Sequence, residues 1–438
     1  MVGQSFTPQL AASFAQAFGT YAGRGPVVVG RDTRPTGRMV EEAVIAGLQS
    51  VGNKPLLAGV VPTPTLLYLT KMLGASGGIA ITASHNDVEW NALKFVGRDG
   101  MFLKPSEADE LFDIYHQQDF PNVEESAVQP VEPVREPMKG HLDRVEAYVA
   151  AQAIRAGGFR VAVDCCNGVG ALHTVSFLRD RLGCDVVPIH DNPHGRFERP
   201  PEPAPQNLEA LGHAVRDQGC AAGFAQDPDG DRLALLDETG DPIGEDLTLA
   251  LGVLQVLSGH SKGPVVANQS ASMVIDHVAA AQGCEVTRTK TGEIYVSERM
   301  MEIGAAVGGE SSGGVIVPAV HPCRDSYTAM ALVLELMVQK GRSIASLRSD
   351  LPRYVLLKKK IPIRPGQAPG VLRAVRRHYE KEKLDLKDGI YIDFGESWLH
   401  IRRSNTEPIL RLITEAPTDA VAERIVQDAR TVIESALD

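Results

Sequence analysis

The sequence has few of the features that would mark an extracellular, membrane or nucleic-acid-binding protein. Its six cysteines have no metal-ligand spacing, and the adjacent pair Cys165 and Cys166 is poorly placed for a mutual disulfide. It has neither a signal-peptide pattern nor an apolar run long enough to span a bilayer. The net charge of -11 argues against nucleic acid or an anionic membrane as a partner of the whole surface, but it leaves room for a local basic pocket. We therefore expect a reduced, soluble, cytoplasmic protein.

The chain of 438 residues is too long for one hydrophobic core, and we expect three or four domains. Three segments share one pattern, and they begin at Pro26, Phe159 and Pro264. Each segment starts with a short β-branched run, passes through a polar loop, and continues as an amphipathic, helix-like stretch that ends at glycine. This pattern predicts three similar doubly wound α/β units.

The last part of the chain has a different pattern. The helix-like stretch VLRAVRRHYEKEK precedes the strand-like runs GIYIDF, WLHIRR and ILRLITEA, and a terminal helix is expected from Asp419. Strands joined by short turns predict an antiparallel α+β domain. The predicted fold is thus three similar doubly wound α/β domains plus a smaller carboxyl-terminal α+β domain around a central cleft. The predicted domains are residues 1–140, 141–243, 244–350 and 351–438.

Four loops of the sequence carry residues suited to catalysis or binding. The first follows an apolar run and contains Ser84, in GGIAITASHN. Ser84 has no G-x-S-x-G elbow around it, so a hydrolase nucleophile of that kind is not indicated. The apolar run before it predicts a strand, and open α/β sheets bind ligands at the carboxyl ends of their strands. The plainer interpretation is that Ser84 caps a turn or helix.

An acidic loop, AQDPDGDRLALLD, covers residues 225–237. Asp227, Asp229 and Asp231 alternate along it, and three carboxylates at this spacing repel one another unless a cation lies among them. Hard oxygen ligands favour Mg²⁺ or Ca²⁺. The glutamate that would close an EF-hand is missing. A solvated acidic hairpin turn is the alternative.

A glycine-flanked loop, VGGESSGGVIVP, covers residues 307–318. Its glycines allow close approach of the backbone to a ligand. Glu310, Ser311 and Ser312 offer donors and acceptors suited to sugar hydroxyls. On its own, the stretch is equally compatible with an ordinary hairpin.

The fourth loop, HIRRSNTEPILR, covers residues 400–411 and concentrates hydrogen-bond donors in a turn between two strands. Arginine forks match phosphate oxygens, and hydroxyl and backbone N–H groups can complete an anion site. A solvated polar turn is the alternative. The donors are Arg402, Arg403, Ser404, Asn405 and Thr406.

Together and in this order, the four loops resemble those of the α-D-phosphohexomutase superfamily, which contains phosphoglucomutase, phosphomannomutase and phosphoglucosamine mutase. TASHN is similar to the family's phosphoserine loop, DPDGDR to its Mg²⁺ loop, GGESSGG to its sugar-recognition loop, and RRSNTEP to its phosphate-binding loop. VGRDTR, VVPTPT and PPEPAPQNL are similar to further family stretches. The resemblance covers nearly the whole chain, with one signature in each predicted domain.

The resemblance implies a mutase that exchanges the 1- and 6-phosphates of a hexose. Phosphorylated Ser84 would be a ligand of Mg²⁺ together with Asp227, Asp229 and Asp231, and Arg232 would lie near this metal loop. The phosphoserine would give its phosphoryl group to a hexose phosphate, and a hexose 1,6-bisphosphate would be the intermediate. The implied substrate-binding residues are Glu310, Ser312, Arg402, Ser404, Asn405, Thr406 and Arg411.

Other residues near these motifs receive roles from the same resemblance. Lys94 matches a family lysine near the transferring phosphoryl group, where it would stabilise charge or shuttle a proton; an exposed lysine after a strand is the alternative. His85 is expected to position the serine loop rather than act as a base, and Arg31 to face the phosphate. We expect Arg34 and Arg38 to be surface charges of the following helix.

The sequence also departs from the family pattern. The amino-terminal G-I-R-G turn, whose arginine helps hold the phosphoserine region in members of the family, is not present. Either the start is truncated or the protein does without this turn, which leaves open whether the phosphoserine region is fully supported and the activity reduced. Asp87 replaces a common proline, and Ser311 stands where a specificity residue is usual. Glu293, in TKTGE, occupies a position where some members have histidine.

The leading hypothesis is a phosphoglucosamine mutase that is a monomer or a homodimer. Phosphomannomutase or phosphoglucomutase activity is the alternative within the family. A non-catalytic phosphosugar-binding protein and a protein that merely loses phosphate from Ser84 are the alternatives from other classes.

Overall fold

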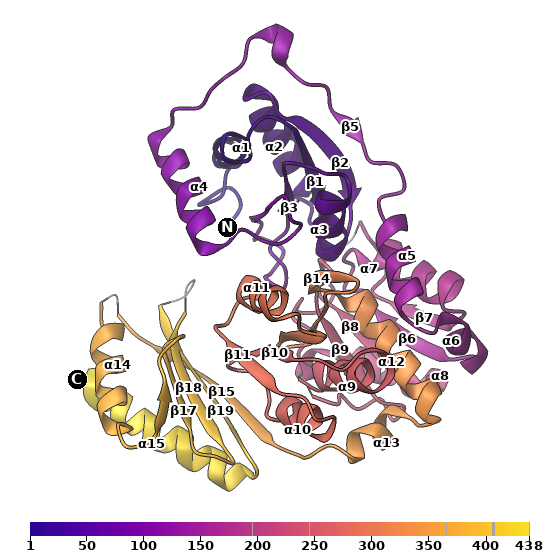
Figure 1. The fold of residues 1–438 in the computed structure, drawn as a ribbon, viewed down its shortest axis with the longest axis vertical. Helices are drawn as coiled ribbons and strands as arrows, with labels where there is room; N and C mark the ends of the chain where they lie inside the picture. The colour runs from indigo at the N-terminus through magenta and orange to yellow at the C-terminus, as the bar shows by residue number, and fades with distance from the viewer. Residues whose placement is uncertain (195, 245, 365, 405–407, 438) are drawn as a thin grey trace.

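Four β-sheets form, one in each of the ranges predicted to be a domain (Figure 1). The structure is a computed structural model and describes residues 1–194, 196–244, 246–364, 366–404 and 408–437. The sheets confirm the predicted fold of three α/β units followed by a smaller antiparallel unit, while the residue boundaries between units stay a prediction. None of the helices in the described ranges has the length and apolar content needed to cross a bilayer.

The first unit has a five-stranded sheet in the order β4-β3-β1-β2-β5. Along β1 the side chains alternate: Val27 and Val29 pack under α1 and α2, whereas Val28 packs under α3 on the opposite face. Both faces of this strand are therefore buried, as expected of a parallel sheet covered by helices. The elements are α1 Pro8–Ala22, β1 Pro26–Arg31, α2 Gly37–Ser50, β2 Lys54–Val60, α3 Thr63–Met72, β3 Gly77–Ile81, β4 Leu93–Val96, α4 Pro105–Gln117 and β5 Glu132–Pro133.

The second unit has a four-stranded sheet in the order β7-β6-β8-β9. β6, β7 and β8 are parallel, and β9 returns antiparallel to β8. A hairpin turn was part of the alternative interpretation of the acidic loop, and the structure places that loop in the turn between β8 and β9. The elements are α5 Lys139–Tyr148, α6 Ala151–Gly157, β6 Arg160–Asp164, α7 Gly170–Ser176, β7 Asp185–Ile189, α8 Glu209–Gln218, β8 Ala222–Gln226 and β9 Leu233–Leu236.

The third unit repeats this arrangement with one more strand, in the order β11-β10-β12-β13-β14. β10, β11 and β12 are parallel, whereas β12, β13 and β14 form an antiparallel meander. The glycine-flanked loop is the turn between β12 and β13. The elements are α9 Leu247–Gln255, β10 Val265–Asn268, α10 Val274–Ala281, β11 Val286–Thr289, α11 Glu293–Ile303, β12 Val307–Glu310, β13 Gly314–Val317, β14 His321–Arg324, α12 Ser326–Lys340 and α13 Ile344–Ser349.

The fourth unit is an antiparallel sheet in the order β15-β19-β18-β17-β16. Leu399, Ile401 and Leu412 lie on the face that packs against α14 and α15. The predicted terminal helix begins at Asp419, as expected. The elements are β15 Val355–Pro362, α14 Ala368–His378, β16 Lys383–Asp385, β17 Ile390–Asp393, β18 Trp398–Arg403, β19 Ile409–Ala416 and α15 Asp419–Leu437.

The second and third units share a single hydrophobic core. One cluster of buried side chains continues from Val163 and Phe177 in the second unit to Leu251 and Val317 in the third. Helix α12 passes through it, and every residue from Ser326 to Met337 is buried. These two units therefore form one packed block, which lies below the first unit in Figure 1.

The other two units join this block through buried polar contacts. On the side of the first unit, His141 of α5 contacts Thr65 of α3 at 2.9 Å and Asp325 at the start of α12 at 3.1 Å. On the side of the fourth unit, the Ser270 hydroxyl contacts Nδ1 of His400 at 2.8 Å, and the Met273 N–H donates to Glu415. Hydrogen bonds of this kind require defined geometry, so they orient the units as well as attach them.

A buried histidine makes the junction between the first and third units sensitive to pH. Nε2 of His321, on β14, donates to the carbonyl of Gly100 at 2.8 Å, and burial lowers the pKa of His321 to about 4. In the unfolded chain the group has its ordinary pKa of about 6.5. The neutral ring therefore contributes stability that is complete above pH 6.5 and is lost as the pH falls through 4.

We predict that the wild-type melting temperature falls more steeply between pH 6.5 and 4 than that of His321→Gln, which keeps a donor but cannot be protonated. The difference corresponds to about 3 kcal/mol over the full window. Differential scanning calorimetry at several pH values would measure it, with His116→Gln, at an exposed position of α4, as the matched control. Parallel curves for wild type and His321→Gln would contradict the prediction.

Candidate active site

Ser84 lies just after the carboxyl end of β3, in a loop that returns to β4. Its backbone has φ of 48°, a left-handed conformation that is uncommon for a residue other than glycine. The Ser84 N–H donates to Thr82 Oγ1 at 2.9 Å. The side-chain oxygen then faces the second unit, where Ser84 Oγ donates to Asp227 Oδ2 at 3.0 Å. A residue 143 positions further along the chain therefore meets the serine.

The acidic loop is the tight turn of the β8–β9 hairpin and is completely enclosed. Asp227, Asp229 and Asp231 are each at most 1% exposed, and their carboxylate oxygens lie within 4.8 Å of one another. Asp227 Oδ1 accepts from the N–H groups of Asp231 and Arg232, both at 3.1 Å, which closes the turn. The loop is therefore a hairpin turn, but the burial of its three carboxylates contradicts the alternative of a solvated one.

The electrostatic state of the three carboxylates depends on their neighbours. Burial, with the charges of Asp231 and Asp229, raises the pKa of Asp227 well above its usual range. Burial also acts to raise the pKa of Asp229, but the Lys94 ammonium outweighs it and lowers that pKa below its usual range. Protons or cations are thus needed here to compensate the charge.

The donor set fits a divalent cation. Asp229 Oδ1 and Asp231 Oδ1 are buried oxygens without a hydrogen-bond donor among the described residues. Buried acceptors of this kind are rare, because leaving them unpaired costs free energy. Carboxylate oxygens are the ligands that Mg²⁺ and Ca²⁺ prefer. The three aspartates would hold the ion, and Ser84 Oγ lies beside them.

Lys94 belongs to β4 of the first unit and reaches the same carboxylates. Its Nζ lies 2.6 Å from Asp229 Oδ2 and 3.5 Å from Asp231 Oδ2. Burial lowers the pKa of Lys94, but Asp229 and Asp231 more than reverse this and hold it above the usual range. The side chain is therefore a cation in this arrangement, and the alternative of an exposed lysine does not hold.

The structure brings His85, Arg31 and Arg232 to the edges of this cluster. Burial lowers the pKa of His85 to about 3, so its ring is neutral and a weak base; Nδ1 lies 3.4 Å from Ser84 Oγ. Arg31 lies beside the same small hollow as Asp229 and donates to the carbonyl of Asp32 at 3.1 Å. The Arg232 Nε lies 3.9 Å from Asp231.

Three residues to which the sequence analysis gave no role also belong to the cluster: Thr63, Arg324 and Glu293. Thr63, the first residue of α3, donates through its hydroxyl to Asp229 at 2.7 Å. Arg324, at the end of β14, joins Asp231 at 2.8 Å to Glu293 at 2.7 Å. Thr63 is the first threonine of VVPTPT, a stretch that the sequence analysis found similar to the family. Nothing in the sequence near Arg324 indicated the role of that residue.

Glu293 is a carboxyl group with an unusual pKa. It begins α11, and burial raises its pKa to about 7 against the opposing effect of Arg324. A carboxyl group with this pKa can exchange a proton near neutral pH. Glu293, at a position where the sequence departs from the family pattern, is thus connected to Asp231 of the acidic loop through two hydrogen bonds made by Arg324.

The glycine-flanked loop packs directly on the acidic hairpin. The Leu233 N–H donates to the carbonyl of Gly313 at 3.2 Å, and a Cβ on Gly313, which has φ of +83°, would lie 2.0 Å from the Leu233 carbonyl. Only glycine fits there. Glu310 accepts from the N–H of Gly292 at 2.6 Å, and Arg324 Nη1 lies 3.6 Å from it. Ser312 follows with φ of 71°.

The predicted phosphate-binding residues lie on the fourth unit. Arg402 and Arg411 are paired across β18 and β19. Burial lowers the pKa of Arg402, with Arg411 adding to the effect and Asp388 and Glu310 opposing it. The Thr291 N–H of the third unit donates to Asp388 at 3.0 Å, so this part of the fourth unit contacts the third. Ser404 is buried at the end of β18, while Asn405 and Thr406 lie outside the described residues.

The prediction for Arg34 was wrong, whereas that for Arg38 was right. Arg38 has a side chain that is 65% exposed and pairs with Glu41 and Glu42 on the surface of α2. Arg34 precedes that helix and its side chain is completely buried. It donates to the carbonyls of Ser84 at 2.6 Å and Asn86 at 2.7 Å, so it belongs to the serine loop.

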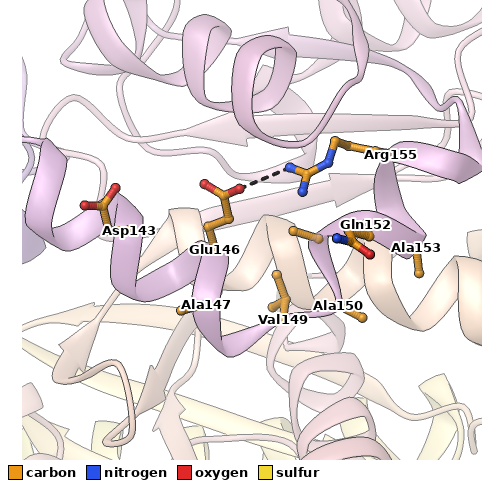
Figure 2. A pocket seen from close by; sticks show the side chains of 9 residues that line it. Asp143, Glu146, Ala147, Val149, Ala150, Gln152, Ala153 and Arg155 are labelled. Carbon is orange, nitrogen blue, oxygen red and sulfur yellow. Dashed lines mark hydrogen bonds and ion pairs between the residues drawn. The ribbon is translucent and has the colours of Figure 1, made fainter.

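A hollow between α5 and α6 lies away from these residues (Figure 2). It has a volume of about 760 Å³, and an ion pair of 3.1 Å between Glu146 and Arg155 crosses its rim. None of the predicted site residues lines it. The lining residues are Asp143, Glu146, Ala147, Val149, Ala150, Ala151, Gln152, Ala153 and Arg155.

Family models of the phosphoglucomutase/phosphomannomutase domains match nearly the whole chain. The α/β/α domain I model matches residues 1–122, and the domain II model matches residues 139–240. The domain III model matches residues 245–354, and the C-terminal domain model matches residues 359–432. All four occur in order.

Individual proteins agree with these models. A protein of Methanopyrus kandleri named "Probable phosphoglucosamine mutase" is 35% identical over 97% of this chain and 93% of its own length. A "Phosphoglucomutase/phosphomannomutase" of Thermococcus kodakarensis is 34% identical over 99% of this chain and 96% of its own length. The crystal structure of a phosphoglucomutase/phosphomannomutase family protein from Burkholderia thailandensis has a TM-score of 0.84 at 25% identity, over 99% and 95% of the two chains.

The buried acidic loop leads to a prediction about metal binding. Asp229→Asn keeps the shape of the side chain but removes one charge and alters an oxygen that has no hydrogen-bond donor. We expect the affinity for Mg²⁺, titrated as MgCl₂ in a calorimeter, to fall by at least about tenfold. The matched control is Asp217→Asn, at an exposed position of α8 in the same unit, which should bind Mg²⁺ like the wild type. Equal affinities of Asp229→Asn and wild type would contradict the assignment.

Proposed function

The chain belongs to the phosphoglucomutase/phosphomannomutase family and is a phosphohexomutase, and from this we propose that it interconverts the 1- and 6-phosphates of glucosamine through phosphorylated Ser84. The observation that carries the mechanism is the 3.0 Å contact between Ser84 Oγ and Asp227. It supports a phosphoryl carrier seated beside a buried set of cation ligands. A hydrolase nucleophile would instead need a neighbouring base, and His85 is too weak a base for that role.

The proposed reaction is an exchange of phosphoryl groups. The Oγ–P bond of phosphorylated Ser84 breaks, and its electron pair stays on Oγ. The hydroxyl oxygen of the hexose phosphate forms the new O–P bond and gives up its proton, which yields a hexose 1,6-bisphosphate. The other phosphate of that molecule then returns to Ser84. Mg²⁺ held by the three aspartates would neutralise negative charge on the phosphoryl group.

The chain's own groups supply positive charge and proton transfer around this step. Lys94 is held as a cation by Asp229 and Asp231, so we assign it to charge stabilisation rather than to proton abstraction. Glu293, with a pKa of about 7, is suited to accept the hydroxyl proton at neutral pH. Arg324 holds Glu293 at 2.7 Å and connects it to the acidic loop.

The sugar and its second phosphate are assigned to the third and fourth units. Glu310 and Ser312 would receive the sugar hydroxyls, and Arg402, Ser404, Asn405, Thr406 and Arg411 the distal phosphate. Arginine pairs across neighbouring strands suit a dianionic group. Because the bisphosphate must present either end to Ser84, this distal site has to accept both the 1- and the 6-phosphate.

The choice of glucosamine rests on the relatives. The name of the Methanopyrus kandleri protein favours glucosamine phosphate, while that of the Thermococcus kodakarensis protein favours glucose or mannose phosphate as the second candidate. All three sugars share the phosphate and most hydroxyls, so the residues that hold Ser84 and the cation do not discriminate among them.

A substrate panel with a Ser84→Ala control tests the proposal. With MgCl₂ and a trace of hexose 1,6-bisphosphate, we expect turnover of glucosamine 6-phosphate with a kcat/KM higher than that of glucose or mannose phosphate. Intact-mass measurement of wild type should show a phosphate-sized increment after incubation with the bisphosphate. Ser84→Ala should lose both the increment and the turnover, because no hydroxyl remains to carry phosphate.

The possible failures have separate meanings. A higher kcat/KM for glucose or mannose phosphate would overturn the substrate choice alone. Phosphorylation of Ser84 without turnover of any sugar would favour a protein that only loses phosphate, and binding of sugars without either would favour a non-catalytic role. Full activity of Ser84→Ala would overturn the mechanism.

A further inference from the structure

Arg34 holds the backbone of the serine loop through a complete set of hydrogen bonds. Its Nη2 donates to the carbonyls of Ser84 at 2.6 Å and Asn86 at 2.7 Å. Its Nη1 donates to the carbonyls of Asp87 at 2.6 Å and Trp90 at 2.9 Å. One planar group therefore binds four carbonyl oxygens within seven consecutive residues, 84–90.

The fifth donor of the guanidinium is also used. Nε of Arg34 donates to Asp32 Oδ2 at 3.0 Å, so all five N–H groups of the side chain have an acceptor. Asp32 in turn accepts from the Thr82 hydroxyl at 2.7 Å, and Thr82 Oγ1 accepts from the N–H of Ser84. Arg34, Asp32 and Thr82 thus form a closed network around Ser84.

The charge of Arg34 is matched within this network. Both side chains of the Arg34–Asp32 pair are completely buried, and the two opposite charges are in direct contact. Within the described part of the chain, the guanidinium donates neither to Ser84 Oγ nor to the acidic loop, because its donors point at four main-chain carbonyls and at Asp32. Its effect on Ser84 is therefore one of geometry rather than of added positive charge.

We propose that Arg34 is a positioning residue that holds the Ser84 loop in the one backbone shape that directs Ser84 Oγ at Asp227. The left-handed φ of 48° at Ser84 is unfavourable for serine, so it persists only where the surroundings enforce it. Two of the four bound carbonyls belong to Ser84 and Asn86, so Arg34 holds the backbone at Ser84 itself and two residues further on. A rigid fork of five donors suits the task better than an ammonium group.

The same side chain also contacts the second unit. The guanidinium carbon of Arg34 lies 5.0 Å from the centre of the Phe197 ring, and stacking of this kind is favourable. In addition, the Thr33 hydroxyl donates to the carbonyl of Asn167 at 2.8 Å. The side chains of Arg34 and Thr33 thus pack against the unit that carries the acidic loop.

The test compares Arg34→Lys with two matched variants. Arg38→Lys removes an exposed guanidinium four residues away, and Val44→Ala destabilises the same unit through its core without touching the loop. Because a displacement of about 1 Å at the reacting group can lower a rate about 100-fold, we expect kcat of Arg34→Lys to fall by about that factor, while KM for the hexose phosphate changes by less than about threefold. Both controls should keep the wild-type kcat at a temperature below their melting transitions.

A second measurement does not depend on the reaction. Hydrogen–deuterium exchange, followed by mass spectrometry, should be faster in the peptide covering residues 82–92 of Arg34→Lys than in wild type, Arg38→Lys or Val44→Ala. In Arg34→Ala, millimolar methylguanidinium should restore part of the lost kcat and of the exchange protection.

The inference rests on the proposed role of Ser84, and the two can fail separately. An inactive wild type would contradict the proposed function. In that case the exchange data alone decide whether Arg34 holds the Ser84 loop. A kcat for Arg34→Lys within about threefold of wild type, exchange in residues 82–92 equal to wild type, or a loss of kcat matched by Val44→Ala would each overturn the positioning role.

Discussion

Three carboxylates buried on one tight turn are the constraint around which the structure is organised. Asp227, Asp229 and Asp231 cannot all remain charged in a low-dielectric environment without nearby cations. The two closest side-chain cations come from other units: Lys94 from the first and Arg324 from the third. Compensating the charge of the turn therefore requires the units to meet at this point, and the active site is assembled by the same contacts that stabilise the buried charge.

Electrostatic and geometric tasks are divided among different residues. The acidic turn, Lys94 and Arg324 determine where charge is tolerated. Burial, with the charge of Asp231, raises the pKa of Glu293 against the opposing effect of Arg324 and Lys94. The loop that carries Ser84 is shaped mainly by groups whose charge is already matched, above all the Arg34–Asp32 pair. Phosphoryl transfer needs both conditions, since the transition state is stabilised by charge only when the donor and acceptor oxygens are in line.

Much of this arrangement could be predicted from the sequence, because short apolar runs and chemistry-bearing loops are local features. The three α/β units and the antiparallel fourth unit follow from such patterns, and the placement of Asp227, Asp229 and Asp231 beside Ser84 follows from the family resemblance. Thr63, Arg324 and Arg34 were missed because the partners of their side chains lie far away along the chain. The antiparallel edge strands pair with strands close in sequence, but a short apolar run does not indicate strand direction. Arg34 and Arg38 have similar sequence surroundings, and only tertiary contacts reveal that one is buried and the other exposed.

The hydrophobic core that the second and third units share has a mechanical consequence. Because α12 is buried along most of its length between them, the acidic loop and the glycine-flanked loop behave as parts of one rigid body. Any hinge must therefore lie at the two polar seams, at His141 and His321 toward the first unit or at His400 and Glu415 toward the fourth. A bound sugar that reverses its orientation would do so against the fixed block of the second and third units. The movement needed to accommodate it would come from the first and fourth units.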